Sequence, residues 1–260
     1  MAKEPDSLVP SAEESIRILQ DLLSMWHAHD GTIALPLIDG TPLPGMAIHV
    51  QVEHAVELTE SVIVLIRNHR YLPAAPLIRL TMECAVTAAW WATNPVGVRG
   101  SVHESARLRS LRIRGMHGGS PASYTDTHEM REAMSEYARF TSGEAKAFEQ
   151  RCKALAGGEW IYPYYRLLSE ASHGGTSLLD EYSEQVPVSA HAPEGIALVQ
   201  HPHYQTLEIA LGLQVIMLTL AIAAWDAVSP AHPDQDSLHE MADRLGFGEF
   251  IPGATGRKRG

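Results

Sequence analysis

The chain has 260 residues, of which 45% are hydrophobic and 20% charged, and its formal net charge is −11 with a pI near 5.6. Such a composition is typical of a globular protein that is long enough to bury a large core. The acidic balance excludes nucleic-acid binding through the surface as a whole, so any nucleic-acid contact requires a local basic patch.

Two cysteines, Cys84 and Cys152, are too few for a disulfide framework or for a zinc site built from cysteines. Both are therefore predicted to be free thiols. The first fifteen residues mix charges and proline without an apolar core, which is not the pattern of a signal peptide. Together these features predict a cytoplasmic protein.

Apolar residues at helical spacing begin after an S-x-x-E capping box at Ser11 and Glu14. Seven further helices are predicted between glycine and proline breaks, at 46–70, 74–93, 101–115, 127–155, 160–173, 204–228 and 236–245. Long loops are expected at 30–45 and 174–203, and loose termini at 1–10 and 252–260. The sequence thus predicts one all-α domain over residues 1–260, a single bundle of about six to eight helices, with room for a minor β-strand near 195–200.

The stretch "IALGLQVIMLTLAIAAW" within 204–228 carries no charge over 17 residues, the lower edge of what a bilayer requires. Glu208 and Asp226 flank it, and flanking lysine or arginine is missing. A helix that is apolar all round is usually the core of a protein of this size. The segment is therefore predicted to be a buried central helix, and no membrane is expected.

Arg79 and Glu83 stand four residues apart in an otherwise apolar helix, and so lie on one face. Two interpretations remain open. The residues form a structural ion pair that fixes the helix register, or they line a polar site inside the bundle.

The segment "YYRLLSEASHGG" (164–175) places four polar residues on one helix face, at spacings 0, 3, 4 and 7: Arg166, Ser169, Glu170 and His173. Histidine moves protons near neutral pH, and the planar guanidinium binds phosphate through two parallel donors. A metal-free site that cleaves a phosphodiester is one hypothesis. The other is an ordinary helix end, with His173 as a cap and Arg166 and Glu170 as an i, i+4 pair.

Arg166 and His173 form an R-x6-H pattern that resembles the R-x4-6-H motif of HEPN-domain proteins, although that family usually has a polar residue where this chain has Leu167. The resemblance implies a helical bundle that dimerises and joins two such motifs into one metal-independent ribonuclease site. Many of these proteins act as toxins or in phage defence, and others keep the fold without catalysis.

The chain also resembles uncharacterised bacterial helical proteins that have an R-x3-E helix followed by a Y-x3-S-x3-H helix. The residues that carry this second resemblance are Arg79, Glu83, Tyr165, Ser169 and His173.

The predicted function is a HEPN-like endoribonuclease that acts as a homodimer, with Arg166 as phosphate clamp and His173 as acid and base. Tyr165, Ser169 and Glu170 are expected to orient them. The alternative is a non-catalytic helical module that binds a protein partner or a small ligand.

The basic patch that RNA binding would need is predicted on one arginine-rich helix, with Arg107, Arg109, Arg112 and Arg114 set against a single acid, Glu104. Such a stripe can follow a phosphate backbone. It can equally be a solvated face, or pair with the polar helix predicted at 127–155.

Several enzyme classes have signatures that this sequence lacks: a glycine-rich phosphate loop, a G-x-S-x-G elbow, a dinucleotide fingerprint and an H-E-x-x-H zinc motif. No DNA-specific motif occurs either. The 14 histidines are scattered and do not mark three or four convergent ligands. No metal and no cofactor are expected.

Overall fold

A computed structural model describes residues 10–29, 34–116, 127–173, 175–202, 204, 206–230 and 234–247, the side chains at 114, 116 and 177 excepted. Within these residues the secondary structure is helical apart from one two-stranded hairpin. The predicted all-α fold class with a minor strand near 195–200 is confirmed.

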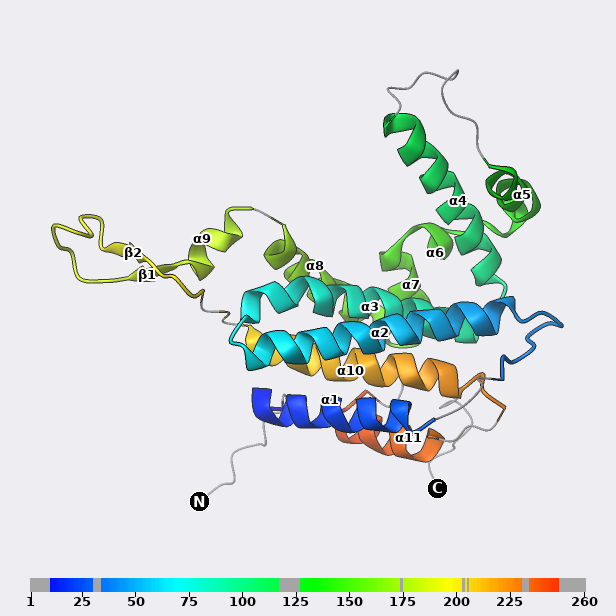
Figure 1. Cartoon of the computed structure of the whole chain (residues 1–260), viewed down its shortest axis with the longest axis horizontal. Coiled ribbons are helices and arrows are strands. Elements are labelled where there is room, and N and C mark those ends of the chain that lie inside the picture. The colour runs from blue at the N-terminus through cyan, green and yellow to red at the C-terminus, as the bar shows by residue number, and fades with distance from the viewer. Residues whose placement is uncertain are drawn as a thin grey trace.

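Four long helices lie side by side along the molecule: α1 (Ala12–His27), α2 (Leu43–Arg67), α3 (Tyr71–Thr93) and α10 (Leu207–Asp226) (Figure 1). The packing partners of α10 are α1, α2, α3 and the short α11 (Gln235–Arg244). Of its 20 residues, 15 are buried, so the predicted buried central helix is confirmed. In the described part of the chain α10 is the one helix long and apolar enough to cross a membrane, a test that a buried core helix also passes.

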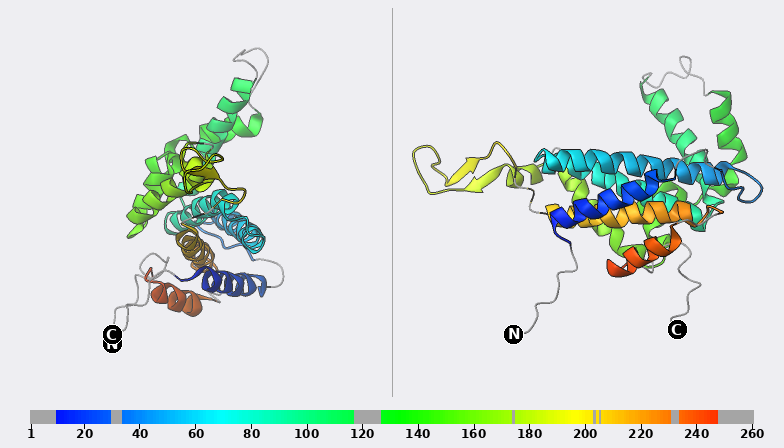
Figure 2. Two further views of the ribbon diagram at one scale, coloured as in Figure 1. Left: turned by 90° about the vertical axis from the view of Figure 1, so that its left-hand side faces the viewer. Right: turned by 60° about the horizontal axis from the view of Figure 1, so that its bottom comes forward.

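The remaining elements surround this layer. α7 (Phe148–Ala154) and α8 (Ile161–Ser172) pack on α3. α4 (Gly97–Met116) and α5 (His128–Glu136) lean away from the long helices as a pair, as Figures 1 and 2 show from three directions. α4 is therefore separated from α8 by the short helices between them.

The single helix predicted over 127–155 was wrong. The segment contains α5, the 3-10 helix η1 (Ala138–Phe140), α6 (Gly143–Lys146) and α7. Thr141 and Ala147 have extended backbone, and the Ser142 hydroxyl accepts the Ala145 N–H and starts α6 as a cap. Side chains that offer the backbone such local hydrogen bonds favour helix starts over helix interiors.

The predicted loop at 174–203 holds α9 (Ser177–Glu181) and an antiparallel hairpin of β1 (Ser183–Gln185) and β2 (Ile196–Leu198). The hairpin extends away from the bundle in Figure 1. Because short helices occur here and in 127–155, the described residues contain eleven α-helices, more than the six to eight expected.

Gly100 allows α4 to approach η1, and its replacement gives a testable prediction. A β-carbon on Gly100 would overlap the carbonyl oxygen of Phe140. Gly100→Ala should therefore lower the free energy of unfolding by about 1–3 kcal/mol, the usual cost of overpacking. Urea denaturation followed by circular dichroism measures this.

Gly115 in the same helix is the matched control, because a β-carbon there meets no atom of the described residues within 4 Å. Gly115→Ala should be neutral or stabilise by about 0.5–1 kcal/mol, as expected in a helix. Equal effects of the two substitutions would contradict the close packing of α4 on η1.

Candidate functional site

A polar network joins α3 to α8. The Arg79 Nε–H donates to the Ser169 hydroxyl over 2.9 Å, and a terminal nitrogen of Arg79 donates to the Tyr165 hydroxyl. The same arginine lies 3.1 Å from the carboxylate of Glu83, and Tyr165 donates its own proton to that carboxylate over 2.8 Å. Arg79, Glu83, Tyr165 and Ser169 thus form one closed set of hydrogen bonds, which is named the α3–α8 network below.

The sequence of α8 explains why Tyr165 and Ser169 reach α3. Pro163 stands in the first turn, where a missing N–H costs nothing, and the helix then continues to Ser172. Ile161 and Leu168 are its buried residues and hold it against the core. Tyr165 and Ser169, four residues apart, lie on this inner side, and the Ser169 hydroxyl also donates to the Tyr165 carbonyl.

Aromatic rings and the Arg79 guanidinium pack around Tyr165 in this network. The Tyr165 ring lies 4.3 Å from the Phe148 ring and 5.9 Å from the Tyr162 ring, and the Arg79 guanidinium sits 4.6 Å above its centroid. Burial and the neighbouring Glu83 carboxylate together raise the pKa of Tyr165 above its ordinary value. The Tyr165 hydroxyl is therefore held protonated, as its donation to Glu83 requires.

Arg151 of α7 is a second partly buried cation beside α3 that was not predicted from the sequence. It donates to the Thr87 hydroxyl over 2.7 Å, while its Nε is buried without a hydrogen-bond acceptor in the described chain. Burial lowers the pKa of Arg151, and the Glu83 carboxylate partly offsets that effect. The sequence pattern did not indicate the contact between Arg151 and Thr87, because the two residues are 64 positions apart and Arg151 lies in the segment predicted to be one long polar helix.

The predicted face of α8 is divided in two. Ser169 turns inward with Tyr165, whereas Arg166, Glu170 and His173 are exposed. His173 caps the helix with an extended backbone, and its N–H donates to the Ser169 carbonyl over 3.1 Å. The structure thus directs Tyr165 and Ser169 to the network and leaves the neighbouring Arg166 and His173 exposed to solvent. These two exposed residues are named the outer Arg166–His173 surface below.

The family model for DUF5677, described as a family of unknown function, matches residues 46–185, more than half of the chain. The chain belongs to the DUF5677 family. It has no significant match among curated proteins or among solved structures.

The DUF5677 match runs from α2 to β1 and includes all of α3, α7 and α8. It therefore contains both the α3–α8 network and the outer Arg166–His173 surface. α1, α10 and α11 lie outside the matched residues.

The arginine stripe of α4 also falls within the DUF5677 match. Arg107, Arg109 and Arg112 are exposed, and the side chain of Arg114 lies outside the described residues. Arg107 is paired within its own helix, through two hydrogen bonds of 2.8 and 2.6 Å to the buried Glu104 carboxylate. Arg109 lines a pocket of about 610 Å³ between α4 and α5, together with Glu129.

The Glu104–Arg107 pair predicts a pH-dependent stability. The hydrogen bonds from Arg107 hold the pKa of Glu104 below its ordinary value of about 4.5. A carboxyl group with a depressed folded-state pKa contributes stability above its unfolded pKa and loses that contribution as the pH falls through the folded value. Glu104→Gln should therefore destabilise the protein at pH 7 and have no remaining effect at strongly acidic pH. Urea denaturation of both proteins across pH 3–7 tests this, and a difference that does not change with pH would contradict it.

The histidines give no metal site in the part of the chain that is described, where no three His, Cys, Asp or Glu side chains are grouped as ligands. The sequence contains two H-x-H pairs, His27 with His29 and His201 with His203, and His203 lies outside the described residues. Cys84 and Cys152 are both free and buried, and burial raises the pKa of each thiol to about 12. Neither is therefore a reactive thiolate near neutral pH.

Proposed function

We propose that this protein is a HEPN-like, metal-independent endoribonuclease that acts as a homodimer in the cytoplasm, as a toxin or in phage defence. One observation carries the proposal. The α3–α8 network holds α8 on α3 by its inner side, so that Arg166 and His173 are both presented to solvent from its outer side.

The chemistry uses these two groups. Attack of a ribose 2′-hydroxyl on the adjacent phosphorus breaks the bond to the 5′-oxygen and leaves a 2′,3′-cyclic phosphate and a 5′-hydroxyl. One group must take the 2′ proton, another must protonate the leaving oxygen, and a fixed cation stabilises the added charge. Arg166 supplies that cation. His173 supplies one proton-transfer group in each chain, and a second copy of the chain supplies the other.

An exposed apolar residue beside this surface favours a dimer. Leu167 follows Arg166 on α8 and leaves 39% of its surface exposed. Pairing two α8 helices about a two-fold axis would remove this side chain from water, at about 25 cal/mol for each Å² buried. The same pairing would bring two Arg166–His173 surfaces together.

RNA would extend from this centre towards α4, where the exposed Arg107, Arg109 and Arg112 would offer cationic groups to its backbone. Tyr165 and Ser169 would act by positioning α8, and Glu170 would orient Arg166 from the next turn of the helix.

The test is the full-length protein incubated with total cellular RNA, with and without EDTA, alongside light scattering of the same sample. Cleavage that resists EDTA, products with 5′-hydroxyl ends and the molar mass of a dimer are the expected results. RNA that remains intact at high enzyme concentration would refute the proposal.

A second candidate is the non-catalytic module that binds a protein or small ligand. The closed hydrogen bonding of the α3–α8 network favours it, because Arg79 donates to Ser169, Tyr165 and Glu83 of its own chain. Such an arrangement stabilises the packing of α8 on α3 and requires no catalytic role for either helix. A monomeric protein without ribonuclease activity would support this candidate instead.

A further inference from the structure

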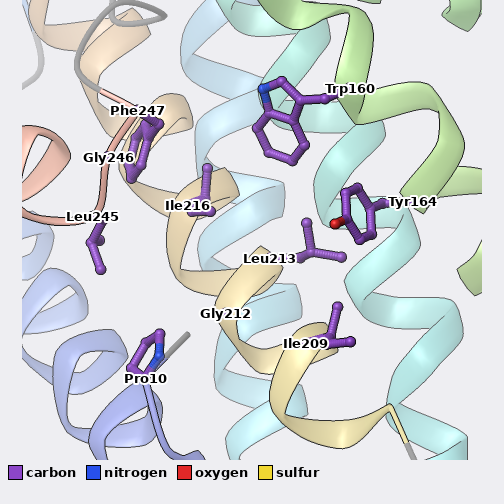
Figure 3. Close-up of a pocket in the computed structure, with 10 residues that line it drawn as sticks. All are labelled: Pro10, Trp160, Tyr164, Ile209, Gly212, Leu213, Ile216, Leu245, Gly246 and Phe247. Atoms are coloured by element: carbon purple, nitrogen blue, oxygen red, sulfur yellow. The ribbon is translucent and has the colours of Figure 1, made fainter. Parts of the chain in front are cut away.

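An apolar pocket of about 470 Å³ lies where α8, α10 and the end of α11 meet (Figure 3). Its walls come from four separate segments of the chain. The residues that line it are Pro10, Trp160, Tyr164, Ile209, Gly212, Leu213, Ile216, Leu245, Gly246 and Phe247. The volume lies within the range of small-molecule sites, about 300–1,000 Å³.

Two aromatic rings form one side of the pocket. Trp160 ends η2 (Gly158–Trp160) and Tyr164 follows one helical turn later, with their ring centroids 5.8 Å apart and their planes at 76°. Figure 3 shows Leu245 and Phe247 on the opposite side, with α10 side chains between the two. Such a corner offers both a ring face and a ring edge to a flat guest.

The residues that line the pocket favour an uncharged ligand. All ten lining residues are uncharged, so an ion placed here would lose its hydration without gaining a counter-charge. The polar side-chain groups among them are the Tyr164 hydroxyl and the Trp160 indole N–H. Sites of this kind combine an apolar wall with a few polar groups that orient the ligand.

Part of the pocket wall is open to solvent. Gly212 of α10 has no side chain to fill the space, and at the rim Ile209 is 39% exposed and Tyr164 38% exposed. A solvent-open pocket with large apolar side chains at its rim leaves area that a ligand would remove from water, at about 25 cal/mol per Å².

We propose that this pocket binds an uncharged, flat aromatic small molecule, held between the Trp160–Tyr164 corner and Phe247. The inference does not depend on the ribonuclease proposal, because none of the lining residues belongs to the outer Arg166–His173 surface. The pocket does share α8 with that surface, so a bound ligand would contact the helix that carries it.

The experiment titrates the full-length protein with N-phenyl-1-naphthylamine, an uncharged fluorescent probe with two aromatic groups. Saturable binding of one probe per chain, with enhanced and blue-shifted emission, is expected. The anionic relative 8-anilinonaphthalene-1-sulfonate carries similar rings with a sulfonate, and should bind at least about tenfold more weakly because no lining residue pairs with its charge. Equal affinity for the two probes, or no saturable binding of the first, would overturn the proposal.

Two variants locate the site. Ile209→Asp places a carboxylate at the rim, and should weaken binding of the uncharged probe by about tenfold or more. Because Ile209 is partly exposed and lies in the first turn of α10, where an acid favours the helix dipole, the fold should tolerate it. Ile209→Trp fills the pocket with an apolar side chain, and should give a similar loss without adding charge.

The matched control is Leu108→Asp, at a residue 36% exposed on α4 and outside this pocket. The Leu108→Asp variant should bind the uncharged probe with the affinity of the wild type. If Ile209→Asp loses its circular-dichroism spectrum, Ile209→Trp decides alone. Wild-type affinity in Ile209→Trp, or an equal loss in Leu108→Asp, would show that the probe binds elsewhere and would reject the site.

Discussion

His173→Ala should lower RNA cleavage by about a hundredfold or more, since the loss of a general acid or base typically costs between 10² and 10⁴ in rate. Arg166→Ala should have a similar effect, because its donors would no longer stabilise the charge that develops on the phosphoryl oxygens. Initial rates on a short fluorescent RNA measure both. The wild-type rate should be the same in EDTA.

Neither substitution should unfold the protein, and this separates lost chemistry from lost structure. Both side chains are exposed, and removing a residue that interacts with a helix end costs about 0.3–2 kcal/mol. Two controls match them in type and exposure. His191→Ala in the hairpin segment and Arg17→Ala on α1 should retain full activity. Cleavage by His173→Ala at the wild-type rate would end the ribonuclease proposal, whatever the controls show.

The sequence was informative where a contact is local. Arg79 and Glu83 pair as their i, i+4 spacing predicted. The apolar run of α10 was correctly predicted to be buried, because a run without polar residues has no side that water can face. In both cases the deciding interaction lies within one helix or depends on composition alone.

The sequence was not informative where a side chain meets a distant segment. Arg79 bonds Ser169 across 90 positions and Tyr165 across 86, and no periodicity links them. The helical wheel grouped Ser169 with Arg166, since a turn of α8 brings them close. Which of the two faces α3 depends on how α8 is rotated, and Ile161 and Leu168 fix that rotation through tertiary packing.

Local hydrogen bonding by polar side chains explains why the single helix predicted over 127–155 is divided into shorter helices. The stretch 127–155 has strong helix formers, yet Thr141 leaves the helix and the Ser142 cap begins a new one. Helix propensities differ by less than about 1 kcal/mol for each residue, so a cap and local tertiary contacts outweigh them. Arg151, which donates to Thr87, lies in α7 beyond this break.

Arg79→Met should lower the free energy of unfolding by about 1–3 kcal/mol, because the hydrogen-bond acceptors of Glu83, Tyr165 and Ser169 would lose a charged donor. The Arg79 side chain is 26% exposed and that of Glu83 35%, so water compensates part of the loss and the cost stays below that of a fully buried pair. The double variant Arg79→Met with Glu83→Leu should cost less than the sum of the two single variants. The coupling energy expected for residues in contact is about 0.5–3 kcal/mol.

Urea denaturation of the wild type, the two single variants and the double variant gives this coupling directly. The matched control is Glu149→Gln, which removes the more exposed i, i+4 pair with Lys153 on α7. An exposed pair contributes little, so the control should change the free energy of unfolding by less than about 1 kcal/mol. If Arg79→Met costs no more than Glu149→Gln, or if the single effects add without coupling, the α3–α8 network does not hold α8 in place. The outer surface of α8 would then lack the support that the ribonuclease proposal requires.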